Sequence, residues 1–155
     1  MTHSFASIDD VQRELAGEDY FADREIATTI FLAQHLAKPL FLEGEAGVGK
    51  TEVAKVLARL MDARLIRLQC YEGLDASHAL YEWNYPKQLL RIKMGEAEGA
   101  SADELGNTIF SEEYLIRRPL LDALSSTGAQ PPVLLIDEVD RADEEFEAFL
   151  LEVLS

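Results

Sequence analysis

Apolar residues along the chain follow two spacings, one typical of helices and one typical of buried strands. Helical spacing is found in residues 20–37, 50–60 and 141–154. Short apolar runs that predict strands occupy residues 40–42, 65–70 and 133–136. The last of these runs is wholly apolar, as in a strand buried on both faces of a parallel sheet, whereas Arg67 and Gln69 are expected to alternate outward. Strands that alternate with helices imply an α/β layered fold.

The segments between these elements carry weaker signals. Residues 1–16 are mainly polar with scattered apolar positions, and we expect them to pack loosely. Residues 95–107 are small and acidic, which predicts an exposed loop. Further helices are predicted over residues 75–83 with Asp75 as the N-cap, from Pro86 through Lys93, and over residues 114–124.

The octapeptide Gly44–Thr51 lies between the first predicted strand and the helix that follows it. A glycine, four free positions, a second glycine and Lys-Thr form the pattern of a phosphate-binding loop. The glycines let the backbone turn tightly around an anion, and the helix N-terminus adds N–H groups and the positive end of its dipole. The predicted nucleotide contacts are Gly44, Glu45, Ala46, Gly47, Val48, Gly49, Lys50, Thr51 and Glu52. The pattern therefore predicts binding of a nucleoside triphosphate.

A pair of carboxylates ends the last predicted strand. Asp137 is expected to hold Mg²⁺ together with Thr51, because such sites bind this ion through a loop hydroxyl and a strand-end Asp. Glu138 is placed to activate water as a general base, and Lys50 to neutralise charge on the transferred phosphate. Taken alone, the two carboxylates could equally begin the following helix, whose first turn is acidic. The phosphate loop upstream favours the metal site.

Composition narrows the classes of partner. With 14 Lys and Arg against 29 Asp and Glu, the 155-residue chain carries a formal net charge of −15, which argues against nucleic acid as the main partner. No apolar stretch is long enough to span a membrane, and residues 1–5 lack the pattern of a secretory signal. Cys70 is alone, which fits a reducing cytoplasm, and its place at a strand end predicts a buried thiol.

Two groups of side chains leave a functional and a purely structural interpretation open. The 3 histidines lack the spacing of metal ligands, so solvated or core positions are favoured. Trp83, with Tyr81 and Tyr85, could form an aromatic patch that faces a partner, although packing in a core is the simpler interpretation.

Together, the two motifs resemble the AAA+ ATPases, and within them the MoxR family. The resemblance is carried by Pro39–Thr51, Ile66–Asp75, Leu80–Tyr85, Arg117–Leu121 and Asp137–Ala142. It runs from about Tyr20 to the last residue, so we expect an N-terminal extension over residues 1–19 and a nucleotide-binding domain over residues 20–155. It also implies that Tyr20 and Phe21 lie near the adenine.

The resemblance carries further implications for activity and assembly. It implies Mg²⁺-dependent ATP hydrolysis, a homo-oligomeric ring, possible as a hexamer, and a chaperone-like role beside a partner with a von Willebrand factor A domain. In the family pattern a central sensor strand, an arginine finger and a helical lid come after the position of Ser155. We therefore expect a three-layer P-loop NTPase fold with a parallel sheet, incomplete because the sensor strand and lid are absent, in a fragment of a longer chain.

Two other functional classes compete with an ATP-driven remodeller. One is a binding module in which ATP sets the oligomeric state without appreciable turnover, and the missing sensor and finger residues favour it for this chain. The other is a small-molecule kinase that shares the phosphate loop. A kinase would need an acceptor site and usually a basic lid, and no Arg-rich segment of that kind is evident.

Overall fold

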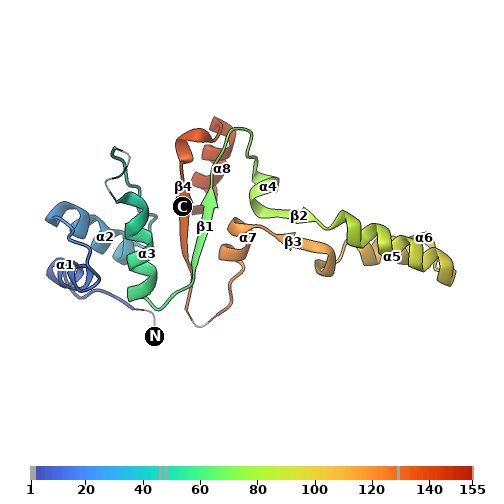
Figure 1. The fold of residues 1–155 in the computed structure, drawn as a ribbon, viewed down its shortest axis with the longest axis horizontal. Helices are drawn as coiled ribbons and strands as arrows, with labels where there is room; N and C mark the ends of the chain where they lie inside the picture. Colours follow the sequence, from blue (N-terminus) through green and yellow to red (C-terminus); the bar gives the residue numbers. More distant parts are fainter. Residues whose placement is uncertain (1–2, 46, 48, 129, 155) are drawn as a thin grey trace.

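A parallel pair of strands lies at the centre of the computed structural model, with helices on both sides of it (Figure 1). Strand β1 (Leu65–Gln69) pairs with β4 (Val133–Asp137) in a register that sets Gln69 opposite Asp137. The structure describes residues 3–45, 47, 49–128 and 130–154. Strands and helices thus form an α/β fold with a small parallel sheet, as the alternation of apolar patterns predicts.

Three helices, α1 (Ile8–Gly17), α2 (Arg24–Leu36) and α3 (Lys50–Leu60), share a core on one side of the strand pair. Its buried residues are Phe5, Val11, Leu15, Ala27, Ile30, Val53 and Val56. The prediction that residues 1–16 pack loosely is wrong. A short stripe of α1, Val11 and Leu15, is completely buried here, and the Ser7 hydroxyl caps the helix by accepting a hydrogen bond from the Asp10 N–H.

A second core lies on the other side of the strand pair, among α4 (Ala76–Leu80), α7 (Pro119–Leu124) and α8 (Glu144–Leu154). Its buried residues are Leu68, Cys70, Leu74, Ala79, Leu120, Phe146 and Leu150. Leu134 and Ile136 of β4 pack against this core. Because side chains alternate along a strand, Leu135 and Asp137 lie on the face of the sheet that points away from it.

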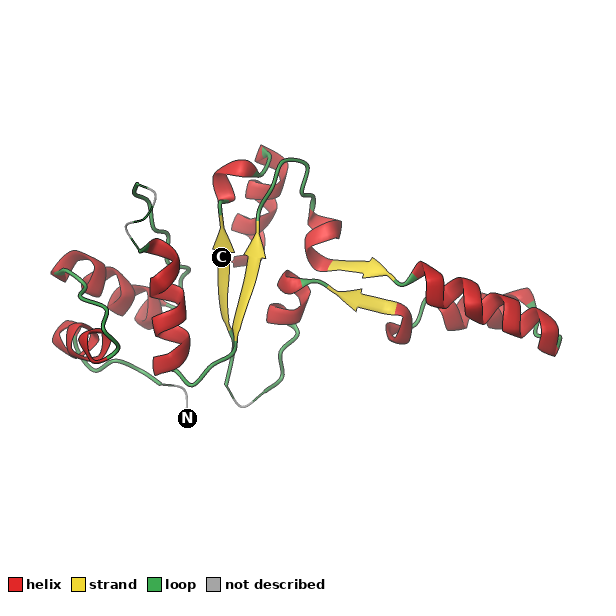
Figure 2. Ribbon diagram, in the orientation of Figure 1, coloured by secondary structure: helices red, strands yellow, loops and turns green. Residues whose placement is uncertain are grey.

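Residues 81–117 form an arm that extends away from both cores (Figure 2). Strands β2 (Tyr81–Trp83) and β3 (Leu115–Arg117) pair antiparallel, and α5 (Tyr85–Glu98), α6 (Ala102–Ile109) and the 3₁₀ turn η1 (Glu112–Tyr114) connect them. Trp83 contacts Phe110 and Tyr81 within the arm, with ring centroids 5.4 and 6.0 Å apart, while Tyr85 is exposed. The helices predicted over residues 75–83 and 114–124 are therefore shorter, because each gives way to a strand of this hairpin.

The segment predicted as an exposed loop over residues 95–107 is largely helical, because α5 continues to Glu98 and α6 begins at Ala102, and only residues 99–101 connect the two helices. Gly95 allows this packing, because a Cβ at that position would lie 2.3 Å from Leu105 Cδ2. A capping box begins α6, in which the side chains of Ser101 and Glu104 each bond to the other residue's backbone N–H. A small residue and a local cap therefore override the loop-like composition of this segment.

The strand predicted over residues 40–42 is not formed. A strand is defined by hydrogen bonds to a neighbour, and among the described residues β4 pairs with β1 alone. Leu40 and Leu42 still pack on the first core, while the intervening Phe41 is 67% exposed. The side chains of β4 are all partly buried, so the expectation of a strand enclosed on both faces is also wrong.

The last predicted helix is divided. A 3₁₀ turn, η2 (Val139–Arg141), follows β4, and α8 starts only at Glu144. The Asp143 side chain caps this helix by accepting a hydrogen bond from the Phe146 N–H. None of the helices in the described part of the chain has the length and apolar character needed to cross a bilayer.

Two adjacent leucines of α8 test the second core. Replacing Leu150, which is 5% exposed, with Ala should lower the free energy of unfolding by about 2–5 kcal/mol, because it leaves a cavity. The same replacement at Leu151, 74% exposed, should change it by less than about 0.5 kcal/mol. Urea unfolding followed by far-UV circular dichroism measures both. Equal losses for the two variants would contradict the described orientation of α8.

Candidate functional site

The phosphate loop leads directly into α3. Gly47 and Gly49 have φ values of 87° and 90°, a left-handed backbone that glycine adopts without steric cost, and Gly49 is the N-cap of the helix. Lys50 and Thr51 are therefore the first two residues of α3, at the positive end of its dipole. Two predicted contact residues, Ala46 and Val48, lie outside the described residues.

Lys50 folds back over its own loop. Its Nζ donates hydrogen bonds to the backbone carbonyl of Gly44 and, at 3.0 Å, to that of Glu45. These contacts hold the ammonium group at the loop rather than extended into solvent. A cation at this point is placed to neutralise an anion bound by the loop.

Thr51 and Asp137 meet although 86 positions separate them in the sequence. The Thr51 Oγ1 lies 3.5 Å from Asp137 Oδ2, a long and therefore weak hydrogen bond. The contact exists because α3 lies against β4 and Asp137 is the last residue of that strand. A hydroxyl and a carboxylate oxygen are the hard ligands that Mg²⁺ accepts, and they leave its other positions to water and phosphate. These two residues therefore fit the predicted metal site.

Arg67 is a residue of this site that the sequence analysis placed only as outward-facing. Its Nη2 lies 2.7 Å from Asp137 Oδ2 and also donates to Gln69 Oε1 at 2.7 Å. A signal was available in the sequence. Two neighbouring parallel strands carry alternate residues on one face, so an Arg two positions before the end of β1 faces an Asp at the end of β4.

Glu138 sits in a strained backbone conformation next to Asp137. Its φ of 55° is uncommon for a residue with a side chain, and such conformations persist where surrounding structure imposes them. Its carboxylate forms an ion pair with Arg141, whose Nε lies 2.9 Å from Glu138 Oε2, and the Glu138 side chain is 47% exposed. The predicted general base is therefore beside Asp137 in the chain but paired with an arginine of η2.

The other predicted nucleotide contacts differ in their surroundings. Tyr20 lies at the loop, with its ring 3.7 Å from where a Cβ on Gly49 would be, and burial together with the Asp23 charge raises the pKa of its phenol. Phe21 is 84% exposed. Glu52 forms ion pairs with Lys55 at 2.9 Å and Arg59 at 3.8 Å, and the Lys55 hydrogen bond lowers the pKa of its carboxyl.

Cys70 continues the pairing of the two parallel strands next to the site. Its N–H donates to the Asp137 carbonyl at 2.9 Å, which extends the parallel ladder by one bond beyond β1. The prediction of a buried thiol is confirmed, since the residue is 1% exposed. Burial, followed by the nearby Asp137 charge, raises the pKa of this thiol, so it remains protonated and poorly nucleophilic.

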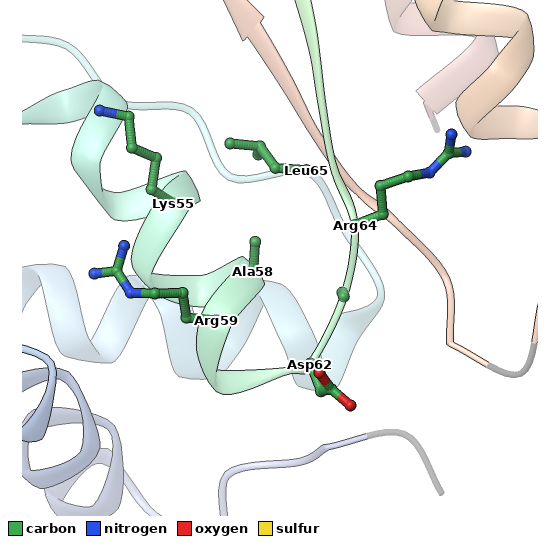
Figure 3. Close-up of a pocket in the computed structure, with 7 residues that line it drawn as sticks. Lys55, Ala58, Arg59, Asp62, Arg64 and Leu65 are labelled. Atoms are coloured by element: carbon green, nitrogen blue, oxygen red, sulfur yellow. The ribbon is translucent and has the colours of Figure 1, made fainter.

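A hollow elsewhere in the described part of the chain offers no alternative site. It has a volume of about 620 Å³ and is formed by the C-terminal half of α3 and residues 62–65 (Figure 3). Lys55 and Arg59 point away from Arg64 in this view, and each cation has its own carboxylate partner. The hollow therefore has no converging set of free charges, and the loop and the strand ends remain the candidate site.

Comparison with known proteins identifies the family of the chain. The family model described as "AAA domain (dynein-related subfamily)" matches residues 39–155, which begins just before the phosphate loop and includes both strand ends. No curated protein and no solved structure matched the chain. The family match covers more than half of the sequence, and it contains Lys50, Thr51, Asp137 and Glu138. The chain therefore belongs to the AAA domain family, in its dynein-related subfamily.

Proposed function

We propose that the protein binds ATP with Mg²⁺ and hydrolyses it. The observation that carries this proposal is the meeting of Thr51, from the start of α3, with Asp137, from the end of β4. Members of this family are in general ATPases, and the carboxyl ends of parallel strands are where such folds bind their ligands. Gly47, Gly49 and Lys50 supply the loop backbone and the cation for the phosphates.

Each residue of the site has a distinct role in this proposal. Thr51 and Asp137 hold Mg²⁺, which when bound neutralises phosphate charge. Lys50 exchanges the Gly44 and Glu45 carbonyls for the β- and γ-phosphate oxygens, where negative charge develops during transfer. Glu138 accepts a proton from the attacking water once its carboxylate has left Arg141.

The biological role that we propose is remodelling of a partner protein, as in MoxR-like ATPases. The arm is consistent with binding to a protein partner. Its helix α5 exposes Leu89, Leu90 and Met94, and the arm extends away from the two cores. A homo-oligomeric ring, a partner with a von Willebrand factor A domain and a cytoplasmic location belong to the same proposal. The family match supports it only at the level of an AAA domain.

One observation favours a second candidate, an ATP-binding module that sets an oligomeric state without appreciable turnover. Glu138 forms an ion pair with Arg141, so its carboxylate is already engaged by a cation. A site in which this contact persists after ATP binding would retain the nucleotide and activate no water.

Lys50→Ala tests nucleotide binding. The loss of charge-assisted contacts to phosphate should weaken ATP binding about 10- to 100-fold. Lys55→Ala removes the same charge from the same helix, but its partner is Glu52, and it should bind ATP like the wild type. Isothermal titration calorimetry measures both affinities. Equal ATP affinities for the two variants would show that Lys50 does not contact the phosphates.

Glu138→Gln separates hydrolysis from binding. Loss of the general base should lower phosphate release at least about 100-fold, while the affinity for ATP changes little. Glu145→Gln, an exposed change in the first turn of α8, is the matched control and should leave turnover unchanged. A wild-type protein that binds ATP but releases no phosphate would instead support the binding module.

A further inference from the structure

We propose that Arg67 is an internal cation that Mg²⁺ must displace from Asp137, so that this arginine sets the Mg²⁺ concentration at which the nucleotide site becomes competent. This inference rests on the proposed function, because it concerns the same metal ligand. It also gives a role to a residue of β1, a strand that contains neither the phosphate loop nor Asp137 and Glu138.

The contact geometry carries the inference. Arg67 Nη2 contacts Asp137 Oδ2 at 2.7 Å, and the same oxygen is the one that faces the Thr51 hydroxyl at 3.5 Å. The guanidinium therefore lies against the very carboxylate oxygen that a metal held by Thr51 would use. Two cations competing for one carboxylate oxygen repel each other, so binding of one weakens binding of the other.

The protein holds Arg67 in this position by two means. The parallel register sets Gln69 opposite Asp137. Arg67 precedes Gln69 by two residues in β1, so its side chain lies on the same face of the sheet as that of Asp137. The Gln69 side chain then accepts a second hydrogen bond from the same guanidinium nitrogen at 2.7 Å. A planar guanidinium that bridges an amide and a carboxylate is a more defined arrangement than a flexible surface pair.

Exposure determines the size of the expected effect. The Arg67 side chain is 55% exposed and that of Asp137 is 21% exposed, so solvent screens their attraction and the pair can open. Removing the arginine should therefore lower the Mg²⁺ concentration for half-maximal binding by about twofold to fivefold. The effect modulates the site and does not decide whether it forms.

The experiment compares Arg67→Ala with Arg64→Ala. Arg64 directly precedes β1, its side chain is 59% exposed, and it has its own partner, Asp122, at 2.9 Å, so its removal changes the net charge equally. Binding of a fluorescent ATP analogue is titrated with Mg²⁺ and, separately, measured in EDTA. Arg67→Lys, which keeps the charge but loses the bridging guanidinium, should lie between the wild type and Arg67→Ala.

The proposal predicts a specific combination of results. Arg67→Ala should need less Mg²⁺ while binding in EDTA is unchanged, and Arg64→Ala should match the wild type in both conditions. In an Asp137→Asn background, Arg67→Ala should have no further effect on Mg²⁺ dependence, because the shared carboxylate is gone. Circular dichroism spectra that match those of the wild type confirm that each variant is folded.

Three results would overturn the proposal. Weaker binding of Arg67→Ala in both EDTA and Mg²⁺ would make the arginine a phosphate ligand instead. A Mg²⁺ dependence identical to that of Arg64→Ala would mean that the pair with Asp137 does not affect the metal. A wild-type protein that binds no nucleotide in either condition would overturn the proposed function together with this inference, whereas the first two results leave ATP binding intact.

Discussion

The parallel pairing of β1 with β4 is the interaction on which the rest of the structure depends. It joins segments that are far apart in the sequence, and its register places Gln69 opposite Asp137 at the carboxyl end of both strands. One face of the pair contributes Leu68 and Ile136 to the second core. The other face carries Arg67 and Asp137 towards Thr51. A shift of one residue in this register would exchange the two faces, and so would bury the charges and expose the core.

The charged side chains of the site share a common arrangement. Lys50 bonds to carbonyls of its own loop, Asp137 pairs with Arg67, and Glu138 pairs with Arg141. Each charged group thus has a polar or oppositely charged partner within the chain, which limits the cost of holding it partly out of water. Binding of a charged ligand at this site is therefore an exchange of partners, in which the protein gives up internal contacts as it gains external ones.

Local sequence signals were sufficient for the elements that carry chemistry. The glycines before Lys50 and the apolar run before Asp137 each specify their own backbone, and α3, β1 and β4 were predicted to within one residue. The predictions fail where the local structure depends on a contact with residues that are distant in the sequence. The helix α6 depends on Leu105 packing over Gly95, and residues 40–42 form no strand because a strand requires a neighbour. The partner of Arg67 likewise follows from pairing between strands, which alternation within one strand does not reveal.

The arm gives the protein a built-in optical label. The sequence contains 1 tryptophan, and Trp83 lies in β2, where its ring meets Tyr81 and Phe110 in edge-to-face contacts. Tryptophan-selective emission therefore comes from the hairpin, which is a separate element from the phosphate loop and from α8. Quenching by an added solute would report how accessible the hairpin is to partners, without interference from nucleotide chemistry at the strand ends.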